Sequence, residues 1–319
     1  MYRIGVDLGG TNIAAGIVNT EGKILHKMSI PTNAHRPAEE IAADIAALCR
    51  RLCEENGVSA DEVAGVGIAT PGVADDEKGE VVYANNLPFR HFPIASLVSK
   101  DFYGKDVHLA NDANAAAWGE AVCGAAGGSK NSVMITLGTG VGGGIILDGK
   151  LFTGANNAGA ELGHIVIEHD GRPCSCGRRG CWEAYSSATA LINMTKEKID
   201  ECHKTGRATK MDELVAAKGK VSGITAFAAM RAGDEAAKEV VDTYLRYLSC
   251  GLVNIVNIFQ PDVISLGGGV SNEGQSLVEV LLPMIRAEQY GGNIEPLTQL
   301  KIAALGNDAG IVGAAMLGI

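Results

Sequence analysis

The feature that most constrains the fold is a unit of strand, glycine-rich bend and strand that occurs twice in the chain. Its first copy spans residues 4–18 (IGVDLGGTNIAAGIV), and its second copy spans residues 133–147 (VMITLGTGVGGGIIL). Both copies lead through a polar turn into a further apolar run, and they align at an offset of about 129 residues, with Ile4 matched to Val133. We interpret the repetition as an internal duplication of a strand-rich unit.

The chain is long enough for two halves of domain size. It has 319 residues, of which 46% are hydrophobic, so two ordinary cores can be filled. The 37 acidic residues outnumber the 27 Lys and Arg residues, and the formal net charge of -10 works against a polyanionic partner such as nucleic acid. No apolar run approaches the ~18 residues of a membrane span, and residues 2–6 have a strand-like pattern with no basic n-region or cleavage site. We expect a cytoplasmic protein without a nucleic-acid or membrane partner.

Hydrophobic periodicity predicts further helices and strands outside the two copies. A helix is expected over residues 37–56, and its apolar stripe consists of Ile41, Ile45, Leu48 and Leu52. The other predicted elements are a buried strand over 63–69, a long helix over 235–259, a strand with a third glycine cluster over 263–270, a strand near 300–304 and a helix from 308. Residues 193–223 are charged and are predicted to form a solvated helical surface.

The bend of the first copy combines two glycines with polar side chains. Gly9 and Gly10 lack a Cβ atom, which allows a phosphate group to approach the backbone N–H groups closely. Thr11 and Asn12 add further hydrogen-bond donors at the same bend. Considered alone, this loop is weak evidence, because a glycine hairpin is usually only a tight turn.

The second copy and the third glycine cluster favour a nucleotide. Gly138 and Thr139 repeat the chemistry of the first bend, so two related loops can hold one polyphosphate, while Gly267 and Gly268 offer a surface without side chains for a base or ribose. The sequence contains neither a P-loop pattern nor a Rossmann fingerprint. Asp7 has no cation beside it, and a carboxylate next to phosphates is best explained by a bridging Mg²⁺.

Asp112 lies where a predicted strand over 107–110 turns into an alanine-rich helix over 115–123. One interpretation is an N-cap, because Asp accepts hydrogen bonds from the first backbone N–H groups of a helix. The other is a general base, because transfer of a phosphoryl group to a hydroxyl needs an acceptor for its proton. Both roles are compatible with this position.

One segment has the composition of a closed zinc site. His164, Cys174, Cys176 and Cys181 supply one imidazole and three thiols, and intervening glycines let the backbone curl around an ion. Four nitrogen and sulfur ligands indicate a structural Zn²⁺ that braces a loop. The Arg178-Arg179 pair is also typical of nucleic-acid zinc knuckles, which the net charge disfavours.

Glu161 and Glu183 flank the zinc segment. A braced loop can present these carboxylates to the hydroxyl groups of a polyol, each of which needs a hydrogen-bond partner once it is buried. Solvated surface acids are the alternative interpretation.

The motifs DLGGTN, NDAN, LGTGVGGG, GAELGH, CSCGRRGC and LGGGVS together resemble the ROK family of sugar kinases and repressors, from residue 4 to the C-terminal helix. The resemblance implies an α/β protein with two ribonuclease-H-like domains of the actin-like ATPase superfold and a central cleft. The expected domains are residues 1–115 plus 302–319, and residues 116–301 with the zinc segment, joined by a hinge near 115–119. The repressors carry an N-terminal helix-turn-helix, so we expect the kinase class here.

The resemblance also implies roles for individual residues. Asp112 would be the catalytic base, and the sugar contacts would be Gly72, Asn111, Asp112, Glu161, His164 and Glu183. The ATP contacts would be Gly9, Gly10, Thr11, Asn12, Gly138, Thr139, Gly267 and Gly268, with Asp7 at magnesium. His164 would both ligate zinc and touch the sugar. Asn85 or Asn86 matches a sugar-side loop less securely.

The expected reaction is transfer of the γ-phosphoryl group of ATP to O6 of an aldohexose. Glucose is the first candidate for this sugar, which would make the protein a glucokinase of glycolysis. The alternatives are a kinase for N-acetylhexosamine or mannose, and a sugar sensor without turnover. Relatives that use polyphosphate share the glycine loops, so these loops do not show whether ATP or polyphosphate supplies the phosphoryl group. The resemblance further suggests a homodimer or homotetramer.

Overall fold

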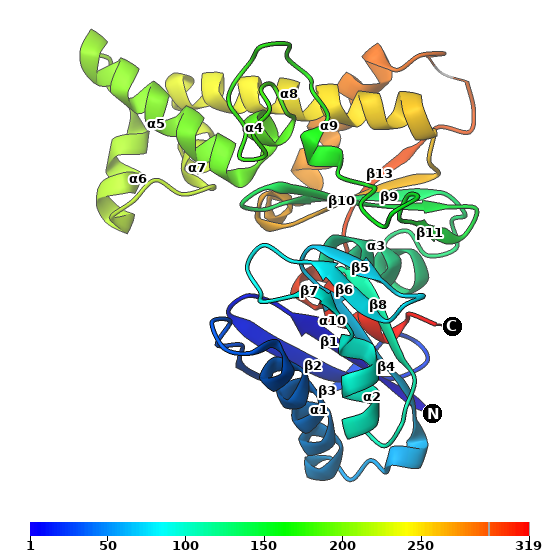
Figure 1. The fold of residues 1–319 in the computed structure, drawn as a ribbon. Coiled ribbons are helices and arrows are strands. Elements are labelled where there is room, and N and C mark those ends of the chain that lie inside the picture. Colours follow the sequence, from blue (N-terminus) through cyan, green and yellow to red (C-terminus); the bar gives the residue numbers. More distant parts are fainter. Residues whose placement is uncertain (293, 319) are drawn as a thin grey trace. The chain divides into compact units, whose positions relative to one another are not determined.

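The computed structural model describes residues 1–292 and 294–318, which divide into two compact units (Figure 1). Unit 1 comprises Met1–Met134, Gly144–Ala160 and Ala303–Ile319, and unit 2 comprises Ile135–Gly143 and Glu161–Ile302. Among the described residues, no helix has the length and apolar character needed to cross a membrane. The hinge near residues 115–119 stays a prediction.

The first sheet has five strands in the order β3-β2-β1-β4-β8. The strands are β1 (Tyr2–Leu8), β2 (Asn12–Val18), β3 (Ile24–Pro31), β4 (Val63–Thr70) and β8 (Val107–Asn111). β1, β2 and β3 form an antiparallel meander, whereas β4 and β8 continue parallel to β1. The predicted strand, bend and strand of the first copy are β1, the loop and β2.

The second sheet repeats this arrangement in the order β11-β10-β9-β12-β13. Its strands are β9 (Ser132–Leu137), β10 (Val141–Leu147), β11 (Lys150–Phe152), β12 (Val263–Gly267) and β13 (Gln299–Ile302). Numbered within its own half, each sheet has the strand order 3-2-1-4-5. The shared order supports the internal duplication inferred from the sequence. The predicted Asp148-Gly149 turn joins β10 to β11, and both residues have the positive φ angles, 50° and 73°, that such a hairpin requires.

Helices and a small third sheet complete unit 1. The sheet consists of β5 (Val73–Asp75), β6 (Glu80–Tyr83) and β7 (Arg90–Phe92), and the helices are α1 (Ala38–Glu55), α2 (Ile94–Asp101), α3 (Asp112–Cys123) and α10 (Ala309–Ala315). The four residues of the predicted apolar stripe of α1 are all buried in the core of the first sheet, which confirms that helix and its orientation.

A buried carboxylate fixes the end of α3. The side chain of Glu120 is fully buried and accepts hydrogen bonds from the backbone N–H groups of Ala125 at 2.7 Å, Ala304 at 3.0 Å and Leu305 at 2.7 Å. Three charge-assisted hydrogen bonds offset much of the cost of removing this group from water. Glu120 thereby ties α3 to the segment that leads into α10.

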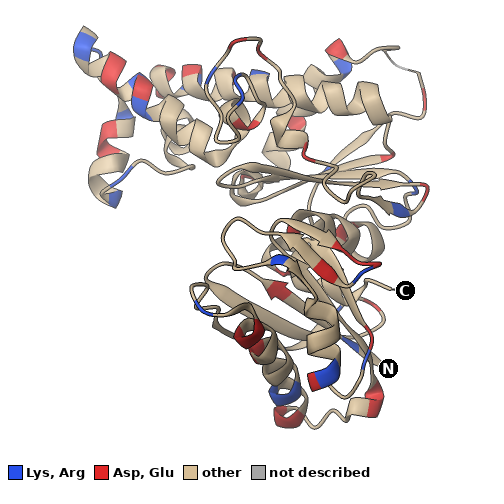
Figure 2. Ribbon diagram, in the orientation of Figure 1, with Lys and Arg blue, Asp and Glu red and all other residues tan. Residues whose placement is uncertain are grey.

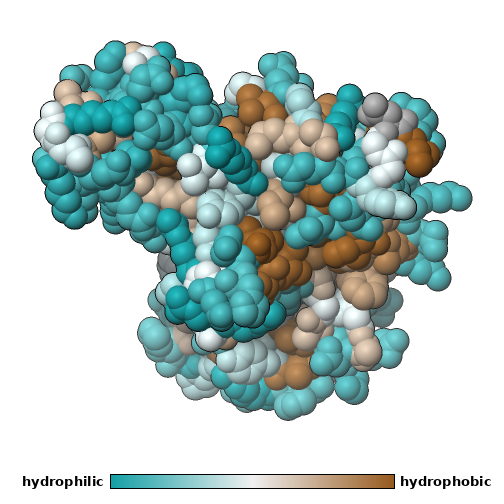
Figure 3. Space-filling model, turned by 90° about the horizontal axis from the view of Figure 1, so that it is seen from above, coloured by the Kyte–Doolittle hydropathy of each residue, from teal (hydrophilic) through white to brown (hydrophobic). Residues whose placement is uncertain are grey.

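Unit 2 is rich in helices above its sheet. They are α4 (Glu183–Ser186), α5 (Ala188–Thr205), α6 (Lys210–Lys218), α7 (Thr225–Arg231), α8 (Glu235–Phe259) and α9 (Gln275–Glu288). Short 3-10 turns lie at Ala60–Glu62 and Gly306–Asp308 in unit 1 and at Leu162–His164 and Gly269–Glu273 in unit 2. Acidic and basic residues alternate along α5 and α6 in Figure 2, and Figure 3 shows a mostly hydrophilic surface over these helices. This agrees with the predicted solvated surface.

Candidate active site

The glycine bend of unit 1 is held by Thr32, a residue that sequence reasoning did not single out. The N–H of Gly9 donates to the carbonyl of Asn12 at 2.9 Å and closes the bend. The Thr32 hydroxyl donates to the carbonyl of Gly9 at 2.6 Å, and its N–H donates to the carbonyl of Thr11 at 2.8 Å. Thr11 and Asn12 are left exposed on the bend.

Another segment of unit 1 approaches the backbone of Gly10. A Cβ atom at this position would come within 2.7 Å of the side-chain nitrogen of Asn86. The structure therefore brings a residue of the predicted sugar-side loop against the predicted phosphate loop. Of the two candidates, Asn85 and Asn86, the second is the one at this loop.

Asp7 and Asp112 lie close enough to influence each other. Asp7 is the next-to-last residue of β1, just before the bend. Its pKa is raised above the ordinary value, first by burial and then by the negative charge of Asp112, while Lys27 partly opposes the shift. The pKa of Asp112 is raised chiefly by desolvation. Asp112 nevertheless keeps an exposed surface. A cation shared by these two carboxylates would remove the repulsion between them, so this donor set suits Mg²⁺.

The helix cap is Asn111 and not Asp112, which corrects one of the two interpretations of Asp112. The side-chain oxygen of Asn111 accepts from the N–H groups of Ala113 at 2.9 Å and Asn114 at 3.3 Å. Asp112 is the first residue of α3, and its carboxylate accepts from the N–H of Ala113 at 2.8 Å and from the side chain of Asn111. Because a neighbour already caps the helix, Asp112 is available for another role.

Two predicted sugar contacts of unit 1 are joined directly. The side-chain N–H₂ of Asn111 donates to the carbonyl of Gly72 at 2.9 Å. The two cap bonds and a further hydrogen bond to the carboxylate of Asp112 engage the rest of this amide. The orientation of its amide is therefore set before any ligand arrives.

In unit 2, the second glycine bend meets the third glycine cluster and the start of α5. The N–H of Ala188 donates to the carbonyl of Gly138 at 2.8 Å, and Thr189 donates its hydroxyl to the carbonyl of Thr139 at 2.8 Å. Gly268 has a φ of 82°, and a Cβ there would lie 2.6 Å from the carbonyl oxygen of Leu137. Gly267 is buried at the end of β12 and supports the exposed Gly268. The second glycine bend, the third glycine cluster and the start of α5 thus lie side by side in unit 2.

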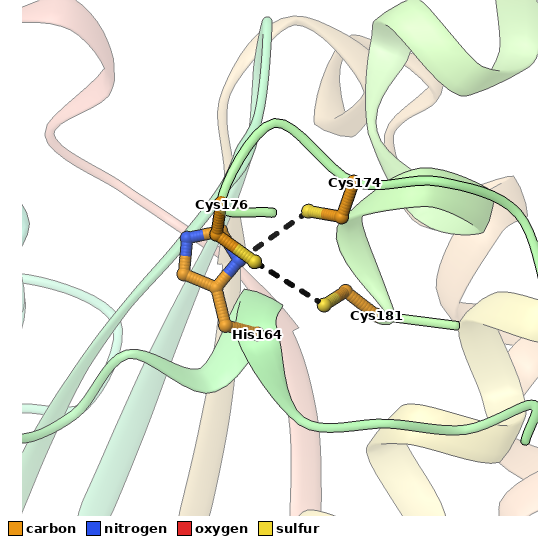
Figure 4. A group of neighbouring side chains, drawn as sticks. All are labelled: His164, Cys174, Cys176 and Cys181. Carbon is orange, nitrogen blue, oxygen red and sulfur yellow. Dashed lines mark hydrogen bonds between the residues drawn. The ribbon is translucent and has the colours of Figure 1, made fainter. Parts of the chain in front are cut away.

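The four predicted zinc ligands converge. Figure 4 shows the side chains of His164, Cys174, Cys176 and Cys181 pointing toward one another, and their ligand atoms all lie within 4.8 Å of each other. Nδ1 of His164 lies 3.6 Å from the sulfur of Cys174, and the sulfurs of Cys176 and Cys181 are also 3.6 Å apart. Two ligands at tetrahedral zinc are separated by roughly 3.7 Å, so both pairs have the spacing of a zinc site.

The backbone around the cluster bends as the glycines predict. Gly177 and Gly180 have φ angles of 88° and 79°, and the N–H of Cys174 donates to the carbonyl of Arg178 at 2.9 Å. Burial raises the pKa of Cys181 to about 12. Zn²⁺ binding would therefore have to displace a tightly held proton from this thiol, as expected for a buried zinc ligand.

Glu161 and His164 share one short turn of unit 2. The N–H of His164 donates to the carbonyl of Glu161 at 3.0 Å, and Leu162 between them is buried. Because Nδ1 of His164 faces the thiols, its Nε2 remains available for a second partner. Glu161 is exposed.

Glu183 connects the zinc segment to the second glycine bend. Its carboxylate accepts from the N–H of Val141 at 3.0 Å and from the hydroxyl of Ser175 at 3.1 Å. Ser175 was not among the predicted site residues, and its place inside the CSCG run is the only signal that could have pointed to it. A hollow of about 650 Å³ in unit 2 is lined by Glu183, Ser175 and Thr139 among others.

The duplicated sheets and the glycine loops define a protein of the actin-like ATPase superfold. The family model described as "ROK family" matches residues 3–319, and the chain belongs to this family. It is 36% identical to the glucokinase of Streptomyces coelicolor over 98% of this chain and 96% of that protein. It is 31% identical to an N-acetylgalactosamine kinase of a Shewanella species over 98% of this chain and 96% of that protein.

A solved structure gives the same picture of the fold. The ROK family glucokinase from Streptomyces griseus, in complex with glucose and AMPPNP, matches with a TM-score of 0.79 and 37% sequence identity. The match covers 99% of each chain. The α/β fold with two sheet-rich halves expected from the sequence is therefore confirmed.

Proposed function

We propose that this chain is an ATP-dependent glucokinase that transfers the γ-phosphoryl group of ATP to O6 of glucose. The observation that carries the proposal is its similarity over nearly its full length to glucokinases, one of which has been solved with glucose and an ATP analogue. The local chemistry agrees with this activity. The chain contains a carboxylate that does not cap its helix, that of Asp112, two related glycine bends, and a loop with polar side chains beside the zinc-ligand cluster.

Asp112 is the proposed general base. Its carboxylate is not the helix cap, and burial raises its pKa above that of an ordinary Asp, which makes the ionised carboxylate a stronger proton acceptor. Accepting the proton of the sugar 6-hydroxyl as the oxygen attacks phosphorus contributes about 10²–10⁴-fold to the rate. Asn111, Gly72, Glu161, His164 and Glu183 are the proposed sugar contacts.

Asp7 and the glycine bends serve the nucleotide. Backbone N–H groups at Gly9, Gly10 and Gly138 and the side chains of Thr11, Asn12 and Thr139 would hold the phosphates, and Gly267 with Gly268 would lie under the nucleoside. Mg²⁺ held by Asp7 would neutralise charge on the phosphates. The crowding of Asp7 and Asp112 supports a cation at this place.

Zn²⁺ at His164 and the three cysteines is proposed to be structural. These four side chains would fill all four positions of a tetrahedral ion, which would leave no open coordination site for catalysis. Its role would be to fix the turn that carries His164 and, through Ser175, the carboxylate of Glu183. The cytoplasmic location and a homodimer or homotetramer are proposed on the family resemblance.

A hexose panel with coupled detection of ADP tests the function. We expect the highest kcat/KM with glucose, and lower values with mannose, N-acetylglucosamine and N-acetylgalactosamine. An amino-sugar kinase is the rival with a specific observation behind it, because one similar protein bears that name. A higher kcat/KM with an N-acetylhexosamine would show that this sugar, and not glucose, is the substrate. If no sugar gave ADP above background, the protein would be a sugar sensor without turnover. Replacing ATP with polyphosphate in the same assay identifies the donor.

A further inference from the structure

A second cavity lies within unit 1, on helix α3. Its volume is about 840 Å³, within the roughly 300–1,000 Å³ range of small-molecule sites. The walls come from the turn after β5, the end of β8, the first two turns of α3 and the loop after β11. We call it the α3 cavity; the polar and aromatic residues that matter here are Asn111, Asn114, Trp118, Thr153 and Asn157.

The α3 cavity is separate from the proposed sugar site. Successive helical residues are rotated by about 100°, so Asn114 and Trp118 lie roughly 200° and 240° around α3 from Asp112. Of the proposed sugar contacts, Asn111 alone lines this cavity. The helix that carries the proposed base therefore presents its opposite face to the α3 cavity.

Asn114 indicates that the α3 cavity takes a polar ligand. The residue is only 4% exposed, and its side-chain oxygen has no hydrogen-bond partner. An unsatisfied buried acceptor costs roughly 1–3 kcal/mol, so it is normally paired with protein, water or ligand. A hydroxyl group in the cavity would supply the missing donor.

The charges around the α3 cavity favour a neutral ligand. Asp75 is paired with Lys78 at 2.8 Å. Asp76 contacts His108 at 3.0 Å and accepts from the N–H of Leu109 at 2.6 Å. The walls carry three carboxylates, those of Asp75, Asp76 and Glu77, and two ammonium groups, those of Lys78 and Lys150, so they present no excess of positive charge that would select a phosphate.

The remaining wall residues suit several hydroxyl groups. Asn157 accepts from the Thr153 hydroxyl at 3.0 Å, which leaves its N–H₂ as a donor. Trp118 donates its indole N–H to the carbonyl of Met316 at 2.8 Å, so its ring is held in place as an apolar wall. A flat ring combined with amides is the chemistry that recognises a polyol.

We propose that the α3 cavity is a second binding site, for a neutral polyhydroxylated ligand of monosaccharide size, glucose included. The ligand donates a hydroxyl to Asn114 and packs against Trp118. It touches the first turn of the helix that begins with Asp112, so the site is placed to influence the base. The inference depends on the proposed function only in the choice of glucose as the probe.

The two tryptophans of the chain provide the measurement. Trp118 lines the α3 cavity, whereas Trp182 is fully buried in unit 2. Protein labelled with 5-fluorotryptophan gives one fluorine resonance for each, assigned with Trp118→Phe. We expect a glucose titration without nucleotide to move the Trp118 resonance in a transition that requires Asn114.

Two matched variants decide whether the transition belongs to the cavity. Asn114→Asp keeps an acceptor of the same shape and should retain the transition, whereas Asn114→Leu removes the acceptor at similar size and should weaken it at least tenfold. Ala155→Arg, at an exposed wall position, should block it without altering α3. If Trp118 responds identically in the wild type, Asn114→Leu and Ala155→Arg, or not at all, the cavity holds water only and the proposal is overturned. Glucose phosphorylation is measured separately by ADP release. A failure of the proposed kinase function can therefore be distinguished from a failure of the α3 cavity to bind a ligand.

Discussion

The two halves of the molecule share one strand order but differ in what lies between their third and fourth strands. In the first half this connection is residues 32–62, which contain α1 and a short 3-10 turn. In the second half it is residues 153–262, which contain the zinc-ligand cluster and α4 to α8. The two halves therefore share a common scaffold, and the longer connection in the second half carries most of what makes them chemically different.

The glycine bends show the same divergence at single positions. The offset of 129 residues matches Asp7 in the first half to Thr136 in the second, since 7 plus 129 is 136. Both bends close with a backbone hydrogen bond, from Gly9 at 2.9 Å and from Gly138 at 3.0 Å. The turn is common to both halves, and the carboxylate beside it belongs to the first alone.

The largest effect is expected from the zinc cluster. We expect one zinc per chain in protein as purified, and Cys181→Ser should lose the metal together with most of the activity, because structural zinc contributes about 10 kcal/mol or more to folding. Metal analysis and thermal unfolding measure both. Cys250→Ser, a half-buried thiol on α8 outside the cluster, is the matched control and should retain zinc. Less than about half an equivalent of zinc in the wild type would count against the cluster as a metal site.

The next effect tests the difference between the two bends. Asp7→Asn should lower kcat by roughly 10²–10³-fold and raise the Mg²⁺ concentration needed for half-maximal rate, because a negative ligand of the cation is lost. Thr136→Ser, at the matched position of the second half, should change kcat less than twofold. Equal losses in the two variants, with an unchanged Mg²⁺ requirement, would show that the bends do not differ in this way.

A smaller effect is expected on stability. Glu120→Gln weakens three backbone hydrogen bonds of a fully buried carboxylate in unit 1 and should lower the free energy of unfolding by about 1–3 kcal/mol. Glu239→Gln in unit 2 is the control, because this exposed carboxylate pairs with Lys198 and Arg207 at the surface and should contribute no more than about 1 kcal/mol. Urea unfolding compares them. A larger loss for Glu239→Gln would reverse the ranking.

Much of the fold followed from local patterns in the sequence. The repeated bends, the Asp-Gly turn and the apolar stripe of α1 each depend on residues close together in the chain, and the structure contains all of them. The helix predicted over 235–259 has the bounds of α8. These features were predictable because glycine, turn residues and periodicity act locally.

The contacts that complete the site were less predictable, because they join distant parts of the chain. Nothing near Thr32 indicates that its hydroxyl holds Gly9, and nothing near Asn86 indicates that it approaches Gly10. The sequence offered Asp112 as a helix cap, whereas the cap is Asn111. Asn and Asp are both good caps, and only the backbone geometry distinguishes the two positions. The pairing of Glu183 with Ser175 likewise required the folded loop.

The central claim is that Asp112 is the base, and the most direct measurement is the rate of ADP release by Asp112→Asn with saturating glucose and Mg-ATP. Because Asn111 caps α3, this change leaves the cap intact and separates the two roles. The account predicts a fall in kcat of about 10²–10⁴-fold, with glucose affinity and unfolding temperature close to the wild type. Retention of most of the wild-type rate with normal glucose binding would contradict it.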